Sequence, residues 1–361
     1  MHDCVDKLQR RAGADAAPPP VTVRDLAKYA GVSAGTISRA LKNEPGLTEA
    51  TRQMVLAAAR TLGYDFCKLR RKRIRRIAFL VHRQHETAAS IPFYSTVQQG
   101  AEEACRRHGI HLTHIAIGPA GGIAEQLRMH APDAILGAGF LEPELLAALR
   151  AGGKPLVLID MKLRGVSSVN PDNHMGGYLA TRHLLGLGRA RVAMISGPLS
   201  HTSIRERNRG YRQALFEAGL LADPRLDLMV DEGVDAETGV REAMQSLLHL
   251  DEPPDAVFCY NDAAALVAMR ACVAAGRTVP YDVSIVGFDD IPGAMLGHRP
   301  LTTLRIDKPG LGALGVELLL REQPAPALEQ VAPVELVVRA STVCHDFRSA
   351  ARRPGEPTQS F

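Results

Sequence analysis

Basic side chains gather at one end of the chain, in a pattern suited to binding a polyanion. Residues 1–76 hold 16 Lys or Arg against 7 Asp or Glu, whereas the remaining residues hold 27 basic and 32 acidic side chains. The net charge of +4 therefore conceals a basic head on an acidic body. Because Lys and Arg contacts to phosphates dominate the affinity of proteins for DNA, we expect that only the head meets nucleic acid.

The spacing of the other reactive residues does not support enzymatic or metal chemistry. Five histidines stand at spacings that superficially resemble those of metal ligands: His82, His85, His108, His111 and His114. No Cys or carboxylate completes either group at a familiar zinc spacing, so strand or surface histidines are favoured. The chain has no Gly-x-Ser-x-Gly pattern, and Gly121-Gly122 is not followed by Lys-Ser or Lys-Thr. We therefore expect no enzyme, no metal site and no cofactor.

The elements that must position the basic head are short helices marked by their caps. Thr22, followed three residues later by Asp25, forms a capping box ahead of a helix over residues 23–30. Gly31 follows, where a sharp turn needs a residue that tolerates positive φ. Ser33 can cap a second helix. Two helices joined by so short a turn are typical of a helix-turn-helix.

Small and branched apolar residues fix how these helices cross. Ala27, Gly31 and Ile37 stand at the small, Gly and branched-apolar positions that a helix-turn-helix needs, and Thr48 caps a third helix. The alternative is a generic three-helix bundle with no role in DNA binding. The spacing and the charge favour a helix-turn-helix, whose second helix enters the major groove. The exposed side chains of this helix include Ser33, Thr36, Ser38 and Arg39.

After Arg76, short apolar runs alternate with amphipathic stretches. The expected strands cover 77–81, 111–117, 134–137, 155–160, 191–196, 256–260 and 284–288, and the longer helices cover 93–108, 144–152, 173–187, 205–218, 236–249 and 261–275. This alternation is typical of parallel sheets with helices on both faces. The repetition is too long for one sheet, so we expect two lobes with a boundary near Asp160.

The head resembles the headpiece of the lactose/galactose repressor (LacI/GalR) family. The resemblance rests on VTVRDLAKYAGVSAGTISRALKNEPGLTEATRQMVLAAARTLGY and continues to about Thr342. It implies an all-α helix-turn-helix head and an α/β, two-lobed, periplasmic-binding-protein-like body of doubly wound parallel sheets. The implied function is a transcriptional repressor that acts as a homodimer on double-stranded operator DNA. A small-molecule effector, a sugar or sugar derivative, would bind between the lobes.

The resemblance also implies which residues meet DNA. The base-reading positions of the family fall on Ala34, Gly35 and Arg39, of which only Arg39 can donate to a guanine or a phosphate. With their neighbours and the basic connector, the predicted DNA-binding residues are Thr22, Arg24, Ser33, Ala34, Gly35, Thr36, Ser38, Arg39, Lys42, Asn43, Arg70, Arg71 and Arg73. The operator sequence does not follow from so small a set of polar side chains.

The effector positions of the family likewise map onto the body. Arg207 falls on the arginine that grips ligand hydroxyls or a carboxylate, Asn261 on a cleft asparagine and Asp289 on an aspartate at a strand end. Asp160 falls on a carboxylate at the lobe junction. The predicted set also includes an aromatic position with its neighbour and two positions where some members have an aromatic, namely Tyr94, Phe93, Val169 and Val234.

Each effector position also has a plainer explanation. Asn261 could cap the helix that follows it, and Asp289 could be a turn residue after a strand. Arg207 could pair with Glu206 or Glu217 on a helix surface. The preserved order and spacing of the whole set favour the cleft.

The connector after Gly63-Tyr64 departs from the family pattern. Members have Pro-Asn, then Ala-Arg and a Leu that wedges into the minor groove, whereas seven of the nine residues 68–76 are basic here. Arg73 stands in the place of that Leu, with Leu69 and Ile74 as apolar neighbours. One interpretation is a hinge whose arginines enter a narrow minor groove, and another is a solvated basic linker. We hypothesise a basic arm that bends DNA little, because arginine insertion needs no kink.

The remaining expectations concern organisation and location. We expect a disordered leader (1–20), the helix-turn-helix domain (21–63), the basic linker (64–76), the effector-binding and dimerisation domain (77–342) and a disordered tail (343–361). No apolar run of 18 residues and no secretory signal stand in the sequence, and its six cysteines are scattered, which indicates a cytoplasmic protein without a membrane partner. A transport receptor and an enzyme on the same fold are the alternatives, and the basic head and the absence of a catalytic pattern count against them.

Overall fold

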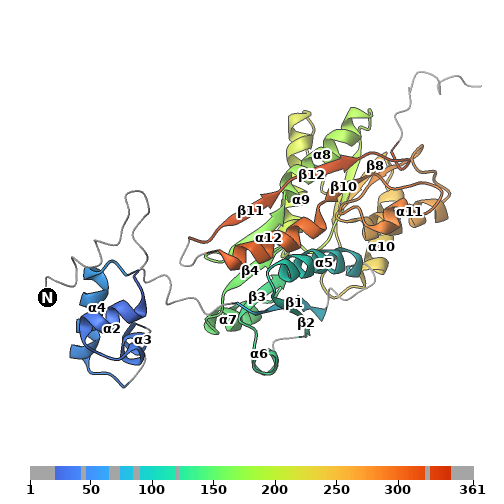
Figure 1. Cartoon of the computed structure of the whole chain (residues 1–361). Helices are drawn as coiled ribbons and strands as arrows, with labels where there is room; N and C mark the ends of the chain where they lie inside the picture. The colour runs from blue at the N-terminus through green and yellow to red at the C-terminus, as the bar shows by residue number, and fades with distance from the viewer. Residues whose placement is uncertain are drawn as a thin grey trace, which may run out of the picture. The chain divides into compact units, whose positions relative to one another are not determined.

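A computed structural model describes residues 21–41, 46–64, 74–83, 90–118, 122–321 and 326–342. The chain forms two compact units, a head that ends at Ile74 and a body that begins at Arg75 (Figure 1). The expected leader and tail, and all of the connector between Tyr64 and Ile74, lie outside the described residues.

The head consists of helices α2 (Val23–Ala30), α3 (Ala34–Leu41) and α4 (Glu49–Thr61). Thr22 and Asp25 form the predicted capping box at the start of α2. Gly31 ends this helix with a φ of 67°, a left-handed conformation that glycine adopts without steric cost. The hydroxyl of Ser33 accepts a hydrogen bond from the Thr36 amide at 3.1 Å, as expected for the cap of α3. The helix-turn-helix is therefore fixed by local chemistry at its turn.

The core of the head draws a large buried apolar side chain from each helix. Leu26, Ile37 and Val55 are fully buried and pack in one cluster. Ala27, the predicted small residue of the first helix, packs against the edge of this cluster. With so little apolar surface to bury, the head depends on its caps as well as on its core.

The first lobe of the body is a six-stranded sheet in the order β11-β5-β4-β3-β1-β2, and all its neighbours are parallel. Its strands are β1 (Arg76–His82), β2 (His111–Ile117), β3 (Ala134–Ala138), β4 (Leu156–Ile159), β5 (Ser167–Pro171) and β11 (Glu329–Ala332). Its helices are α5 (Ile91–Arg107), α6 (Ile123–His130), α7 (Pro143–Ala151) and α12 (Lys308–Leu320). Helices α5 and α12 pack on one side of the sheet, and α6 and α7 pack on the other (Figure 1).

The second lobe repeats the design with a four-stranded parallel sheet in the order β7-β6-β8-β9. Its strands are β6 (Val192–Ser196), β7 (Asp227–Met229), β8 (Ala256–Cys259) and β9 (Ser284–Val286). Its helices are α8 (Asn173–Gly186), α9 (Thr202–Glu217), α10 (Ala236–Leu248) and α11 (Asp262–Ala274), and the 3₁₀ helix η3 (Pro292–Met295) follows β9. Helix α8 packs against α9, and α10 packs against α11.

The chain crosses between the lobes three times. It leaves the first lobe after β5, returns between β10 (Thr303–Ile306) and α12, and leaves again between β11 and β12 (Val334–Val337). Strands β10 and β12 pair antiparallel and hold two of these crossovers together. The lobe boundary expected near Asp160 is wrong by one strand, because the residues after it form β5, which pairs with β4 in the first sheet.

Glycines let paired helices in both lobes approach to backbone contact. A Cβ on Gly177 of α8 would overlap the carbonyl of Arg207 in α9, and one on Gly210 of α9 would overlap the carbonyl of His174. In the first lobe, Gly100 of α5 meets Pro309 of α12 in the same way. The contact between α8 and α9 therefore fixes the position of the Arg207 backbone relative to α8.

We expect Gly177→Ala to destabilise the body by about 1–3 kcal/mol, because the added methyl group forces α8 away from α9. Gly186→Ala, at the exposed end of the same helix, is the matched control. Its Cβ meets nothing within 4 Å, and the change should be neutral or stabilise by up to about 1 kcal/mol. Urea unfolding of the full chain measures both, and equal midpoints for the two variants would refute the packing argument.

Candidate DNA and effector sites

Helix α3 presents the side chains predicted to read DNA. Ala34, Gly35 and Arg39 are exposed, whereas Ile37 on the opposite face is fully buried. A Cβ on Gly35 would meet only the Ser33 hydroxyl, at 3.8 Å, so the start of the helix is open to close approach by another backbone. This end of the helix can therefore lie deep in a groove, with Arg39 as the long polar side chain that reaches further along it.

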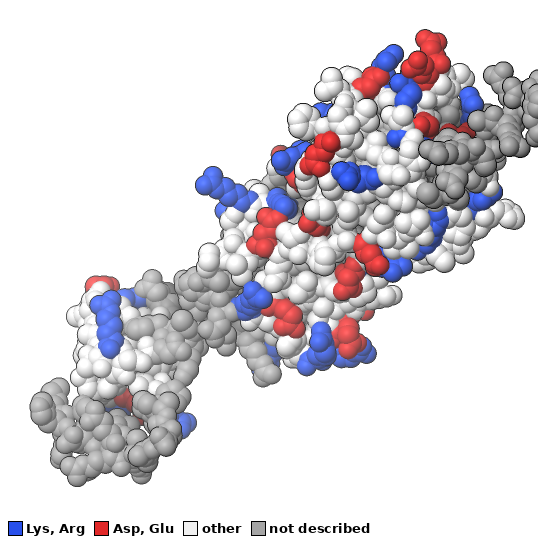
Figure 2. Space-filling view, turned by 90° about the horizontal axis from the view of Figure 1, so that it is seen from above, with Lys and Arg blue, Asp and Glu red and all other residues white. Residues whose placement is uncertain are grey.

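Other predicted DNA-binding residues support the turn or lie beyond the described ranges. The Thr22 hydroxyl donates to Asp25 at 2.6 Å, so this side chain is part of the cap of α2. Arg24 is exposed in the first turn of that helix. The structure does not describe Lys42, Asn43, Arg70, Arg71 or Arg73, and their roles stay predictions. On the body, basic and acidic side chains mix over the face shown in Figure 2, as expected for a unit without a polyanion-binding surface there.

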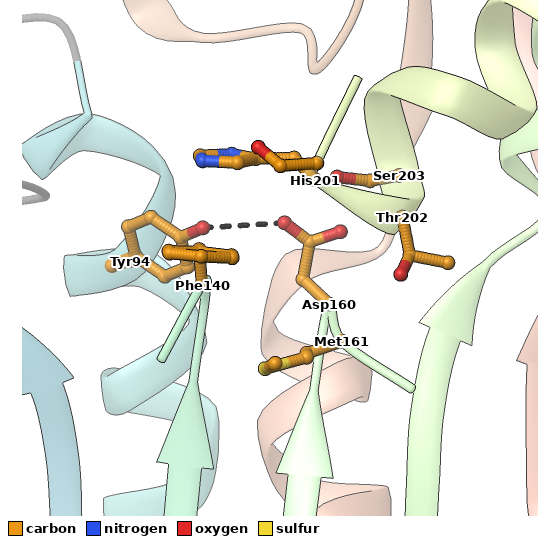
Figure 3. A pocket seen from close by; sticks show the side chains of 8 residues that line it. Tyr94, Phe140, Asp160, Met161, His201, Thr202 and Ser203 are labelled. Carbon is orange, nitrogen blue, oxygen red and sulfur yellow. Dashed lines mark hydrogen bonds between the residues drawn. The ribbon is translucent and has the colours of Figure 1, made fainter. Parts of the chain in front are cut away.

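A small cavity lies between the two lobes of the body (Figure 3). Its lining comes from both lobes: Tyr94, Phe140, Asp160 and Met161 from the first, and Ser200, His201, Thr202 and Ser203 from the second. The cavity encloses about 20 Å³, room for about one water molecule. A ligand of sugar size therefore requires the lobes to separate.

The lining residues follow the carboxyl ends of parallel strands. Phe140 comes shortly after β3, Asp160 directly after β4 and Ser200 shortly after β6. Open parallel sheets bind ligands at this edge, because the connecting segments there are free to vary while the strands hold them in place. Asp160 has a φ of 59°, a left-handed conformation uncommon for a residue with a side chain. The turn directs its carboxylate into the cavity (Figure 3).

Asp160 and Tyr94 form the polar wall of the first lobe. The Tyr94 hydroxyl donates to Oδ2 of Asp160 at 3.2 Å. Burial raises the pKa of the Asp160 carboxyl, and the positive charge of Arg207 opposes the shift. Burial and the negative charge of Asp160 raise the pKa of Tyr94 well above its usual value. A hydrogen bond from the Ser203 hydroxyl of the second lobe also lowers the pKa of the Asp160 carboxyl, so a bound hydroxyl would replace or join Ser203 there.

Arg207 of the second lobe does not line the cavity, but its charge acts on Tyr94 and Asp160, and it is only 4% exposed. Its Nε donates to Oδ1 of Asn173 at 2.8 Å, and Nη2 lies 3.5 Å from Oδ1 of Asp289. Nη1 donates to the carbonyl of Tyr260 at 2.5 Å, and the guanidinium stacks 3.6 Å from the centre of the Phe288 ring. The guanidinium is therefore held by three separate segments of the lobe, around Asn173, Tyr260 and Phe288–Asp289.

The alternative pairing of Arg207 on a helix surface is wrong. Glu206 pairs with Arg209 at 3.1 Å, and Glu217 accepts a hydrogen bond from Tyr178 at 2.7 Å. Arg207 points inward instead, since the close contact between α8 and α9 leaves it no path to the surface.

Asp289 lies beside Arg207, in the turn after β9. Its φ of 110° is a backbone conformation that favours glycine. Burial raises the pKa of its carboxyl to about 6, while the charge of Arg207 lowers it and that of Asp160 raises it. Asp160 and Asp289 thus repel one another across the cleft, and Arg207 offsets part of that repulsion.

Of the predicted effector residues, only Tyr94 and Asp160 line the cavity. The side chain of Asn261 accepts from the Ala264 amide at 2.8 Å and so caps α11, as its plainer explanation proposed. Phe93 is buried with its ring edge-on to Tyr94, at 5.0 Å between ring centres. Val169 is fully buried in β5, and Val234 is 45% exposed in the turn before α10.

Sequence reasoning missed a contact between the lobes at the cavity. The Phe140 ring of the first lobe stacks on the His201 imidazole of the second, with ring centres 4.5 Å apart and planes within 6° of parallel. Burial lowers the pKa of His201, which favours the neutral ring. Both residues follow predicted strands, so the rule that ligands meet the carboxyl ends of strands could have found them.

Another buried carboxylate, that of Asp262, lies close to Asp289. Asp262, the first residue of α11, has no exposed surface. Its Oδ1 accepts from the Thr303 hydroxyl at 2.5 Å, and its Oδ2 accepts from the Ile291 amide at 2.9 Å. Burial and the nearby charge of Asp289 raise its pKa to about 8. At neutral pH the group is therefore mostly protonated.

We expect the Asp262→Asn variant to gain stability over the wild type as the pH rises. The unfolded pKa of an aspartate is about 4, so the folded protein holds a proton that the unfolded chain releases between about pH 4 and pH 8. The unfolding free energy of the wild type loses this contribution over that window, and asparagine removes the loss. The difference between the variant and the wild type should grow by at least about 1 kcal/mol between pH 5 and pH 8.5. Urea unfolding at both pH values measures it, and a constant difference would contradict a protonated Asp262.

Comparison with known proteins agrees with this arrangement. Residues 22–65 match the family model "Bacterial regulatory proteins, lacI family", and residues 181–342 match the "Periplasmic binding protein-like domain". The transcriptional regulator MalR of Streptomyces coelicolor is 33% identical over 348 residues, which cover 92% of this chain and 97% of MalR.

Solved structures agree over the same length. The transcriptional regulator CelR in complex with cellobiose has a TM-score of 0.68 at 30% identity, covering 89% of this chain and 100% of CelR. The lac repressor dimer bound to operator and an anti-inducer has a TM-score of 0.64 at 26% identity, covering 90% and 99% of the two chains. The relatives are transcriptional regulators rather than enzymes, and no described helix is long and apolar enough to span a membrane. The helical head and the two-lobed α/β body are confirmed as the predicted fold, and the chain belongs to the LacI family of DNA-binding transcriptional regulators.

Proposed function

We propose that this regulator is a homodimeric repressor whose operator affinity is controlled by a sugar or sugar derivative bound between the lobes of its body. The observation that carries the proposal is a cluster of buried polar groups between the lobes, in which Tyr94 and Asp160 line the cavity and the charges of Arg207 and Asp289 of the other lobe act on them. The cellobiose bound to CelR and the operator bound to the lac repressor dimer support it by relationship.

The chemistry of this cluster favours a neutral polyhydroxyl ligand over an anion. Two buried carboxylates can accept hydrogen bonds from hydroxyl groups, as Asp160 does from the hydroxyls of Tyr94 and Ser203. Arg207 already binds Asn173, Tyr260 and Asp289, so its charge is offset within the lobe. The rings of Tyr94, Phe140 and His201 offer flat surfaces for the faces of a sugar.

On the DNA side, we propose that α3 lies in the major groove with Arg39 as its base-reading residue. Ala34 and Gly35 would let the backbone approach closely, and the basic connector would follow the phosphates. Two heads of a dimer would read two half-sites related by two-fold symmetry. The residues that make up the DNA and effector sites remain part of this proposal.

We expect Arg39→Ala to weaken binding to the operator by about 1–3 kcal/mol while leaving effector binding unchanged, because Arg39 would lose a bidentate contact to a base edge. Fluorescence anisotropy with the DNA upstream of its own gene, and with random DNA, measures the effect. Arg225→Ala, an exposed arginine of the body, is the control and should change neither affinity. An equal loss of affinity for both DNAs would mean that Arg39 contacts only phosphates and reads no base.

Thermal-shift screening against cellobiose, ribose and other neutral sugars tests the effector proposal, because a ligand that binds the folded body raises its melting temperature.

We expect Asp160→Asn to weaken binding of the sugar found in that screen at least about tenfold, since a charge-assisted hydrogen bond is lost. The variant should be no less stable than the wild type, because burial opposes the charge on Asp160. Asp251→Asn, in an exposed turn, is the control and should keep wild-type affinity. The absence of any sugar-dependent shift in the wild type would overturn the proposal.

A further inference from the structure

A buried lysine joins the two lobes behind the effector site. Lys308, the first residue of α12, is only 7% exposed. Its Nζ donates to the carbonyl of Asp289, and it donates to the carbonyl of Asp290 at 3.1 Å. Helix α12 packs on α5, β4 and β5 of the first lobe, whereas the two carbonyls belong to the turn after β9 in the second. The contact therefore ties the lobes together beside a crossover.

The turn that Lys308 holds has an unfavourable backbone. Asp289 has a φ of 110° and Asp290 a φ of 51°, so two successive residues with side chains adopt conformations that favour glycine. Such a turn persists only where its surroundings fix it. The carbonyl contacts of Lys308 are part of those surroundings.

The side chains of the same turn point to two different parts of the body. Asp289 faces Arg207 in the cleft at 3.5 Å. Asp290 binds Arg305 of β10 at 2.7 Å and Arg339, just after β12, at 2.5 Å. The turn thus connects Arg207 to the two strands that carry the crossovers.

The environment of the ammonium group makes this contact strong. Burial lowers the pKa of Lys308, and the charges of Asp289, Asp290 and Asp262 oppose that shift. A charged donor forms stronger hydrogen bonds than a neutral one, and removing it would leave two buried carbonyls poorly satisfied. Replacing Lys308 should therefore release the turn.

We propose that Lys308 is a positioning residue that transmits effector binding at Asp289 to the first lobe, and so to operator affinity. The inference rests on the proposed function, in that an effector binds between the lobes. Asp289 is coupled through its charge to Asp160 in the cavity, and Lys308, which binds the backbone of the Asp289–Asp290 turn, acts through that turn. The chain enters the first lobe from the connector at β1, which places that lobe next to the head in sequence. A link between α12 and the turn changes when the lobes open or close.

The test compares three variants of the full chain. Lys308→Met removes the charge and keeps the length of the side chain, and Lys308→Arg restores charge and donors. Lys154→Met is the matched control, because Lys154 also donates to a backbone carbonyl, that of Pro132 at 2.7 Å, but within one lobe. Operator Kd is measured for each with and without cellobiose, or with the sugar that gives the largest thermal shift in the wild type.

We expect Lys308→Met to bind operator without sugar within about twofold of the wild type, whereas the ratio of Kd values with and without sugar shrinks about tenfold. Lys154→Met should keep the wild-type ratio, and Lys308→Arg should recover most of it. A role confined to stability would lower the melting temperature of both methionine variants and leave both ratios unchanged. That result would overturn the proposal.

Hydrogen exchange of the full chain gives a readout that needs no effector. The Asp289 amide donates to the Leu304 carbonyl at 2.8 Å and the Ile291 amide to Asp262 at 2.9 Å, so both report on the turn. Lys308→Met should speed their exchange at least about tenfold, and Lys154→Met should not. Wild-type exchange rates in Lys308→Met would refute the positioning role.

If Lys308→Met fails to fold, Lys308→Gln, which keeps an amide donor without charge, takes its place. If no sugar shifts the wild type, the effector proposal fails, and the exchange measurement still decides the role of Lys308.

Discussion

The body depends on one buried guanidinium. Arg207 joins the start of α8 through Asn173, the end of β8 through Tyr260 and the turn after β9 through Asp289. A charge at this depth is tolerable only because each bond is short or charge-assisted and an aromatic ring covers one face. The glycine contact between α8 and α9 follows from the same need, since it brings the backbone of Arg207 close enough for these bonds. The packing of α8 on α9 thus determines where the guanidinium of Arg207 lies.

Local chemistry in the sequence was enough to predict the head. Capping boxes, a glycine with positive φ and one buried anchor per helix act within a few residues, so Thr22, Gly31 and Ile37 define the turn without knowledge of the rest. The body was less predictable where local signals fail. Helix α12 is apolar on all sides, so its sequence lacks the period of an amphipathic helix. Strands β10 and β12 span only four residues each. The crossovers between the lobes could therefore not be predicted from sequence patterns.

The site could be predicted only in part for a related reason. Spacing and family resemblance pointed to Asp160, Arg207, Asp289 and Tyr94, and the structure brings them together, since the charges of the first three all act on Tyr94. Their role in effector binding stays a prediction. Asn261 caps α11 rather than facing the cleft because of the backbone turn between β8 and α11, and no sequence pattern predicts the conformation of that turn. The stack of Phe140 on His201 joins segments about 60 residues apart in different sheets, a relation that appears only once both lobes are assembled.

The volume of the cavity has a kinetic consequence. At about 20 Å³ the space between the lobes holds about one water molecule, so an effector bound as proposed would arrive and depart only when the lobes part. Diffusion would then set an upper limit on the association rate, and the frequency with which the lobes open would set the actual rate. Such a regulator would average over brief fluctuations in effector concentration. Its response time would depend on its own hinge rather than on the medium around it.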